Sequence, residues 1–145
     1  MSGISVFFEE TKPFRLHKKL LKKHINFLLE TEQKVPGELS IIFCSDSYLL
    51  NMNREYLQHD YFTDIITFDY SEGSVVSGDL FISADRIREN AAIFAVSFKM
   101  ELYRVIFHGV LHLAGYKDKT EKEKKLMRDK ESFYLKGIDF DKEEI

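Results

Sequence analysis

The chain has 145 residues, with 44% hydrophobic and 31% charged side chains and a formal net charge of −3. This length and composition are typical of one globular domain, which we expect to span residues 1–145. The net charge excludes a protein that binds polyanions through its overall charge, so nucleic-acid contact requires a local basic surface. No apolar run approaches the roughly 20 residues of a membrane span, and the N-terminus lacks a secretory signal pattern. We therefore expect a cytoplasmic protein without a membrane partner.

The hydrophobic pattern predicts strands and helices in an irregular alternation. Strands are expected at residues 4–8, 39–44, 65–70 and 80–83, and helices at 13–30, 46–56, 83–95, 97–114 and from 120 onward. This order predicts an α+β fold (mixed α/β) with a small four-stranded sheet, mostly parallel with one antiparallel strand, covered by about five helices. Cys44 is the only cysteine and ends an apolar strand, so we expect a buried, inert thiol and no internal disulfide.

Residues 108–118 contain three side chains that can bind one metal ion. His108 and His112 are one turn apart on the predicted helix 97–114, where residues four apart share a face with Cβ atoms about 5–6 Å apart. Gly115 can adopt the left-handed conformation that ends a helix, so the chain can turn back and bring Asp118 to the same point. Three protein ligands leave a fourth position for water, which is the arrangement of a catalytic zinc ion.

Two other interpretations of the histidine pair stay open. The histidines can be core residues, although this otherwise apolar helix would then have to supply partners for two buried imidazoles. The ligand spacing also matches the metzincin peptidase motif HExxHxxGxxH. Gly109 stands where that motif has its catalytic glutamate, so the general base of a peptidase is missing from the helix, which argues against proteolysis.

Three sequence blocks resemble the YbeY family of rRNA maturation factors, which are metal-dependent endoribonucleases. Residues 108–116 read HGVLHLAGY, which is similar to the family signature HGxLHLxGYDH. Residues 53–56 (NREY) and 63–68 (TDIITF) resemble the family's NxxYR and TDVLSF. Residues 78–83 (GDLFIS) are similar to its GDIxIS strand, and the three blocks occur in family order.

The resemblance implies cleavage of single-stranded RNA, in 16S rRNA 3′-end maturation and ribosome quality control. The implied partners are rRNA and the ribosome or its small subunit, and the implied cofactor is zinc. By the same resemblance Thr63, Asp64 and Asp79 are candidate substrate contacts, and the two aspartates are also candidates for proton transfer. Capping of turns beside the strands is an equally good role for these aspartates.

Two positions depart from the family pattern. The family's third histidine is Asp118 here. Aspartate is also a zinc ligand, but its charge weakens the acidification of bound water and makes manganese or another hard divalent metal more competitive. The family's arginine after the tyrosine is Leu57, and Arg54, on the same helix face, is the candidate replacement for its phosphate contact.

These departures motivate a second hypothesis, a non-catalytic ribosome-assembly module that binds RNA and holds a structural metal. A metallopeptidase is the third, from the ligand spacing alone. Basic side chains also gather on the predicted first helix, at Arg15, Lys18, Lys19, Lys22 and Lys23. We expect a solvated face whose apolar side packs on the sheet, with phosphate contact through the basic side as the alternative.

Overall fold

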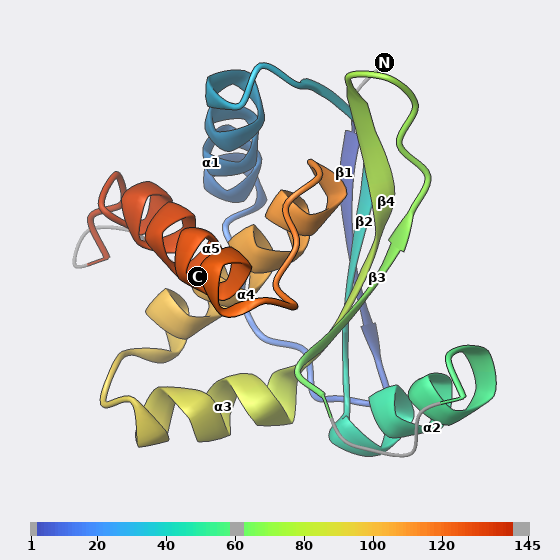
Figure 1. Cartoon of the computed structure of the whole chain (residues 1–145). Coiled ribbons are helices and arrows are strands. Elements are labelled where there is room, and N and C mark those ends of the chain that lie inside the picture. Colours follow the sequence, from blue (N-terminus) through green and yellow to red (C-terminus); the bar gives the residue numbers. More distant parts are fainter. Residues whose placement is uncertain (1–2, 59–62, 141–145) are drawn as a thin grey trace.

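The computed structural model describes residues 3–58 and 63–140, which form four strands and five helices (Figure 1). In chain order these are β1 (Gly3–Glu9), α1 (Lys18–Thr31), β2 (Val35–Cys44), α2 (Asp46–Tyr56), β3 (Ile65–Asp69), β4 (Val75–Ser83), α3 (Ala84–Ile93), α4 (Phe98–Leu113) and α5 (Glu121–Leu135). The predicted α+β class and the predicted set of elements are confirmed.

The four strands form one sheet in the order β1-β2-β4-β3. Strands β1, β2 and β4 run parallel, and β3 runs antiparallel to β4, with Ile65 opposite Ile82 and Asp69 opposite Gly78. A short turn joins β3 to β4, whereas α1 supplies the crossover that a parallel pair such as β1 and β2 requires. The predicted sheet, mostly parallel with one antiparallel strand, is therefore confirmed.

The two faces of the sheet carry different helices, as Figure 1 shows. Ile41 and Leu80 belong to the large buried core that includes residues of α1, α4 and α5. Ile66 belongs to a smaller cluster with Leu49 and Met52 of α2, on the other face. Helices α3 and α5 both pack against α4. Since α4 is enclosed in this way, polar side chains that it carries inward need partners within the protein.

Helix α1 begins at Lys18 rather than at Pro13, which corrects the predicted start. The segment before it is irregular because Phe14 packs into an aromatic cluster, with its ring centroid 5.0 Å from that of Phe8 and 4.9 Å from that of Phe43. His17 is the N-cap, and its Nδ1 accepts a hydrogen bond of 3.2 Å from the amide of Leu20.

Strands β2 and β4 begin at Val35 and Val75, earlier than the sequence predicted. These two residues pair with each other across the sheet. The early part of each strand contains proline or glycine, which weakens the strand pattern, so tertiary pairing decides where the strands begin.

Cys44 is fully buried at the end of β2, as predicted. Burial raises the pKa of its thiol to about 12, so the reactive thiolate is scarce at neutral pH. Within residues 3–58 and 63–140, none of the helices is long and apolar enough to cross a membrane.

Candidate metal centre

Helix α4 carries two histidines on one face, near its C-terminal end. The side chains of His108 and His112 are each 25% exposed, and their ring centroids are 4.6 Å apart with the planes at 82°. Most other residues of this helix are buried and apolar. The two imidazoles therefore lie at the edge of the core, where solvent reaches them.

The end of α4 turns the chain back toward these histidines. Gly115 has a φ of 110°, which other residues rarely adopt. Its amide donates to the carbonyl of His112, and the amide of Tyr116 donates to the carbonyl of Leu111, both at 3.0 Å. This is the Schellman pattern of a helix end. The predicted stop at Gly115 is confirmed, and Asp118 follows directly after the turn.

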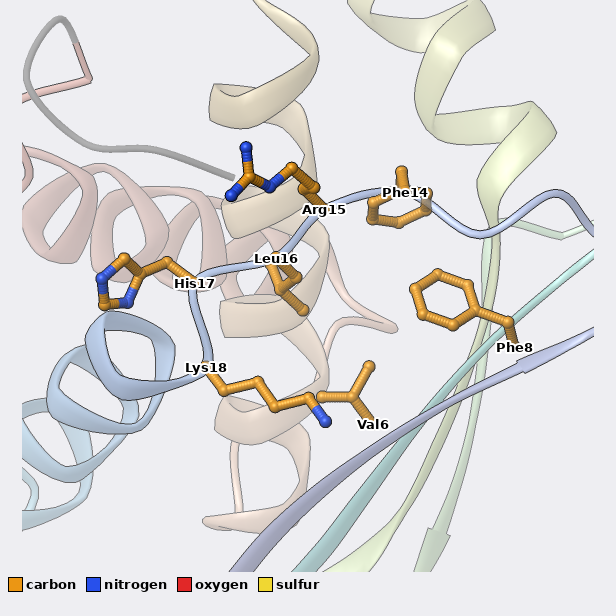
Figure 2. A pocket seen from close by; sticks show the side chains of 7 residues that line it. All are labelled: Val6, Phe8, Phe14, Arg15, Leu16, His17 and Lys18. Carbon is orange, nitrogen blue, oxygen red and sulfur yellow. The ribbon is translucent and has the colours of Figure 1, made fainter.

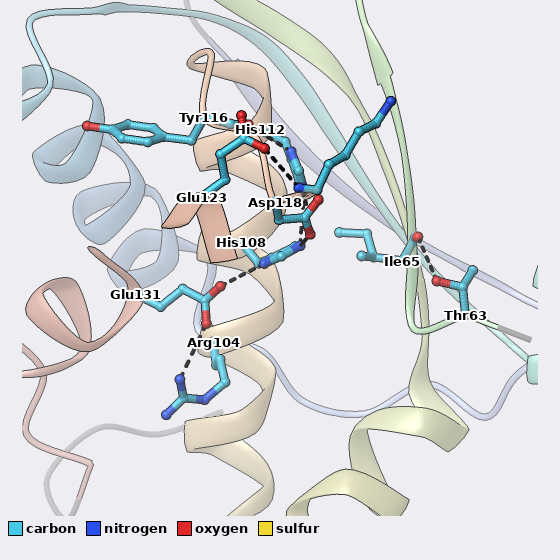
Figure 3. A network of polar contacts seen from close by, with 10 residues as sticks. Thr63, Ile65, Arg104, His108, His112, Tyr116, Asp118, Glu123 and Glu131 are labelled. Atoms are coloured by element: carbon cyan, nitrogen blue, oxygen red, sulfur yellow. Dashed lines mark hydrogen bonds and ion pairs between the residues drawn. The ribbon is translucent and has the colours of Figure 1, made fainter. Parts of the chain in front are cut away.

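Three side-chain atoms converge on one point, as Figure 3 shows. The Nε2 atoms of His108 and His112 are 3.1 Å apart, and Oδ2 of Asp118 is 3.3 Å from each of them. The structure thus brings together all three residues that the sequence named as metal ligands. The side chain of Asp118 is 39% exposed, so the cluster is accessible from solvent.

The hydrogen bonds of the two Nδ1 atoms determine the protonation of the histidine rings. Nδ1 of His112 lies 2.9 Å from the carbonyl oxygen of Tyr116, which can only accept, so Nδ1 carries the hydrogen. Nδ1 of His108 lies 2.7 Å from Oε2 of Glu131 and donates to that carboxylate in the same way. In the neutral rings both Nε2 atoms therefore present lone pairs, and Asp118 adds a carboxylate oxygen.

This donor set fits a divalent ion. Three ligands of a tetrahedral zinc ion, each about 2.0–2.1 Å from the metal, lie about 3.3 Å from one another, and the separations here are 3.1, 3.3 and 3.3 Å. Without a positive charge, three lone pairs would face one another. Burial disfavours the charged form of His108, but its hydrogen bond to Glu131 and the nearby carboxylates outweigh burial and raise its pKa. A proton or a metal ion is thus favoured at this point.

Glu131 of α5 was missed by the sequence reasoning. It is 5% exposed, and besides holding His108 it accepts a hydrogen bond of 3.3 Å from Nη1 of Arg104, one turn earlier on α4 (Figure 3). A carboxylate in this position fixes the ring orientation of a metal-binding histidine. The sequence did contain one indication of this role. Glu131 shares the buried face of α5 with Met127 and Tyr134, and a carboxylate on a buried face requires a partner.

Burial also affects two more acidic residues, one on α4 and one just before β3. Glu101 is 2% exposed, and its Oε1 is 3.6 Å from Nε of Arg104, without a hydrogen-bond partner among the described residues. Burial raises its pKa to about 6, although Arg104 opposes this. Burial also raises the pKa of Asp64, against the opposing charge of His108. Asp64 is thus within electrostatic reach of the cluster.

A carboxylate at the C-terminal end of α1 holds the loop that carries Asp118. Glu32 directly follows α1, and its side chain accepts hydrogen bonds from the hydroxyl of Tyr116 at 2.5 Å, from Nζ of Lys130 at 3.1 Å and from the hydroxyl of Tyr134. Burial opposes ionisation of Glu32, but these three donors outweigh it and lower its pKa. Since the carbonyl of Tyr116 holds His112, Glu32 connects α1 and α5 to the cluster.

The structure gives Gly109 a steric role. A Cβ atom at this position would lie 2.7 Å from Cδ1 of Ile65 and 2.9 Å from Cδ2 of Leu80. Glycine therefore lets α4 approach β3 and β4 closely, and a glutamate here would collide with the sheet. The close packing at this position thus also disfavours the missing peptidase base.

Three other residues named from the sequence do not contact the cluster. Thr63 lies just before β3, where its hydroxyl donates to the carbonyl of Ile65 at 3.3 Å, and Figure 3 shows Ile65 between Thr63 and the cluster. Asp79 lines a pocket with residues of α2 on the opposite face and accepts a hydrogen bond of 3.3 Å from Tyr70. Arg54 is exposed on α2. The structure does not bring Asp79 or Arg54 to the cluster.

Comparison with known proteins gives a family match over most of the chain. The family model described as Endoribonuclease YbeY matches residues 7–139. A relative named Endoribonuclease YbeY from Parabacteroides distasonis is 47% identical over 130 residues, which are 90% of this chain and 92% of that protein. One of the same name from Cytophaga hutchinsonii is 50% identical over 131 residues, which are 89% of this chain and 92% of that protein.

A solved structure also matches. The solution structure of a Thermotoga maritima protein aligns with a TM-score of 0.62 at 28% identity, covering 92% of this chain and 87% of the other. The family match begins within β1, continues through α5 and includes the three clustered residues. The chain therefore belongs to the family described as Endoribonuclease YbeY.

Proposed function

We propose that the protein is a metal-dependent endoribonuclease that cuts single-stranded RNA in rRNA processing. The observation that carries the proposal is the convergence of two Nε2 atoms and one carboxylate oxygen within 3.3 Å, in a chain whose relatives are named endoribonucleases. The proposed substrate is the 3′ end of 16S rRNA, with ribosome quality control as the setting and the ribosome or its small subunit as the partner. Such a substrate places the protein in the cytoplasm.

In this proposal His108, His112 and Asp118 hold the metal. A divalent ion bound there would polarise a phosphoryl oxygen and lower the pKa of a water molecule. Glu131 and the carbonyl of Tyr116 keep both Nδ1 atoms protonated, so that both Nε2 atoms stay available as ligands. We propose zinc as the ion, with manganese as the main competitor because Asp118 supplies a hard, charged oxygen.

Asp64 is the proposed proton-transfer residue. Its burial raises its pKa, and it lies close enough to His108 for their charges to interact. A carboxyl group with a raised pKa exchanges protons more readily near neutral pH than an exposed aspartate does. Thr63, next to Asp64 in the chain, is a candidate for substrate contact. We propose that Arg54 and Asp79 contact the RNA at a distance from the cluster.

The two alternatives receive less support. A purely structural metal is usually enclosed by four protein ligands, whereas the described residues supply three and the cluster is partly exposed. A peptidase would need a general base at position 109, where the residue is glycine and a side chain would have to displace the methyl groups of Ile65 and Leu80.

The test is cleavage of a single-stranded rRNA fragment by protein loaded with zinc or with manganese. We expect cutting by the wild type and a loss of at least about a hundredfold for His112→Ala, in line with the weight of metal-ion catalysis. Asp129→Asn, a change of an exposed carboxylate on α5, is the control and should cut normally. If the wild type and His112→Ala behave alike with either metal, the proposal fails.

A further inference from the structure

Positive charge is concentrated in one segment of this acidic protein. Residues 12–23 contain six lysines and arginines and no acidic residue, so this +6 against the formal −3 of the chain leaves −9 for the rest. All six side chains are exposed; they are Lys12, Arg15, Lys18, Lys19, Lys22 and Lys23. The segment forms the approach to α1 and its first half (Figure 1).

Among the described residues, no carboxylate neutralises these cations. Across residues 3–58 and 63–140, none of the six forms an ion pair with a carboxylate. Helices α2, α3, α4 and α5 each have an acidic residue in their first turn, whereas α1 has none and begins with Lys18 and Lys19. Cations near a helix N-terminus oppose the helix dipole, so this arrangement does not favour the stability of α1.

A pocket of about 450 Å³ lies beside the basic segment. Its lining combines the apolar side chains of Val6, Phe8, Phe14 and Leu16 with the polar side chains of Arg15, His17 and Lys18. Figure 2 shows Phe8 and Phe14 facing each other at one end of the pocket, while Lys18 extends along the other. An apolar floor with a cationic rim suits a planar base next to its phosphate.

We infer that this basic segment and its pocket form a second binding surface for single-stranded RNA, separate from the metal centre. The lysines contact successive phosphates, and the pocket takes one unpaired base. The inference rests on the proposed function for the identity of the polyanion. Helix α1 is about 20 Å long and only its far end, at Glu32, reaches the loop of Asp118. An RNA that occupies both places must therefore extend well beyond the cleavage site.

The test measures binding, so that it does not depend on cleavage. Metal-loaded wild type and Lys18→Gln/Lys22→Gln are titrated with a single-stranded 2′-O-methyl RNA, which resists cleavage, over a range of salt concentrations. Lys125→Gln/Lys136→Gln is the control, because it removes the same charge from exposed positions of α5 and its end. A duplex of the same sequence and anionic vesicles are titrated alongside, and the thermal unfolding of each variant is recorded.

Each phosphate contact on a single strand contributes about 0.7 to the salt slope, so the loss of two should reduce the slope by about 1.4 and weaken binding about 25-fold at 0.1 M salt. The control should keep the wild-type slope, the duplex should bind more weakly than the strand, and the unfolding temperature of the double variant should not fall. On cleavable RNA, the double variant should raise KM and leave kcat unchanged.

An equal loss in the control variant would show a general charge effect and overturn the inference. Equal affinity for the duplex would overturn the assignment of a base to the pocket. Vesicle binding that is lost in Lys18→Gln/Lys22→Gln while RNA binding is kept would make the surface a membrane contact instead. Normal RNA binding without cleavage would contradict the proposed function but not this surface.

Discussion

Oε2 of Glu131 lies 2.7 Å from Nδ1 of His108, and this contact joins α5 to the metal centre. Glu131→Ala would leave the ring of His108 free to rotate and to change tautomer. We expect zinc affinity to fall by about 10–100-fold, measured by competition with a chelating dye. Glu89→Ala, at an exposed position of α3, should bind zinc as the wild type does. Unchanged affinity in Glu131→Ala would exclude this role.

Asp118 is the proposed ligand in which this chain departs from the family pattern. Asp118→Ala should lower metal occupancy, because two histidines alone hold an ion weakly. Asp118→His should restore occupancy and shift the preference from manganese toward zinc, since imidazole is the softer donor. Elemental analysis after dialysis against equal zinc and manganese measures both effects. Full occupancy in Asp118→Ala would show that Asp118 is not a ligand.

Gly109 is expected to resist substitution. A Cβ there would lie 2.7 Å from Ile65 and 2.9 Å from Leu80, and such overpacking costs about 1–3 kcal/mol. Alanine recovers about 1 kcal/mol through its helix propensity. Gly109→Ala should therefore lower the free energy of unfolding by about 1 kcal/mol, as measured in urea.

The matched control for this change is Gly137→Ala. A Cβ at Gly137 meets its nearest atom at an ordinary 3.6 Å, so the change in stability should stay within about 0.5 kcal/mol. If Gly109→Ala is as stable as Gly137→Ala, the close approach of α4 to the sheet does not constrain this position.

Glu101 should make stability depend on pH. Its pKa is raised from 4.5 to about 6 in the folded protein. The folded state therefore holds the proton more tightly than the unfolded state, and stability is lost as the pH rises from about 4.5 to 6. The loss amounts to about 2 kcal/mol at the full shift, at 1.36 kcal/mol per pKa unit.

The test for Glu101 is urea unfolding of Glu101→Gln at pH 4 and pH 8. The variant should be more stable than the wild type by about 2 kcal/mol at pH 8 and nearly equal to it at pH 4. Glu89→Gln, on the exposed side of α3, serves as the control and should show no such pH-dependent gain. A variant less stable than the wild type at pH 8 would mean that the Glu101–Arg104 pair stabilises the fold.

The sequence predicted those parts of the centre that are local in the chain. His108, His112, Gly115 and Asp118 lie within eleven residues, so the geometry of one helix end determines their arrangement. Glu131 and Glu32 escaped prediction because their partners are distant in sequence, and only the packing of α5 and α1 brings them together.

Packing between distant parts of the chain also explains why some predicted helix and strand boundaries were wrong and why Asp79 lies away from the cluster. Strand β4 alternates between its two faces, so that Leu80 and Asp79 point in opposite directions. Nothing in that strand tells which face α4 covers. The late start of α1 likewise follows from the packing of Phe14 against Phe8 and Phe43, which no local pattern shows.

Glu32 has a consequence for how the protein acquires its metal. Because Tyr116, Lys130 and Tyr134 all donate to this one carboxylate, the ligand loop is ordered by the protein's own hydrogen bonds. A metal ion would then bind to side chains that are already held in place, unlike a zinc finger, which folds around its metal. We therefore expect that ions would exchange without unfolding, so that the metal bound in the cell would follow the supply of divalent ions.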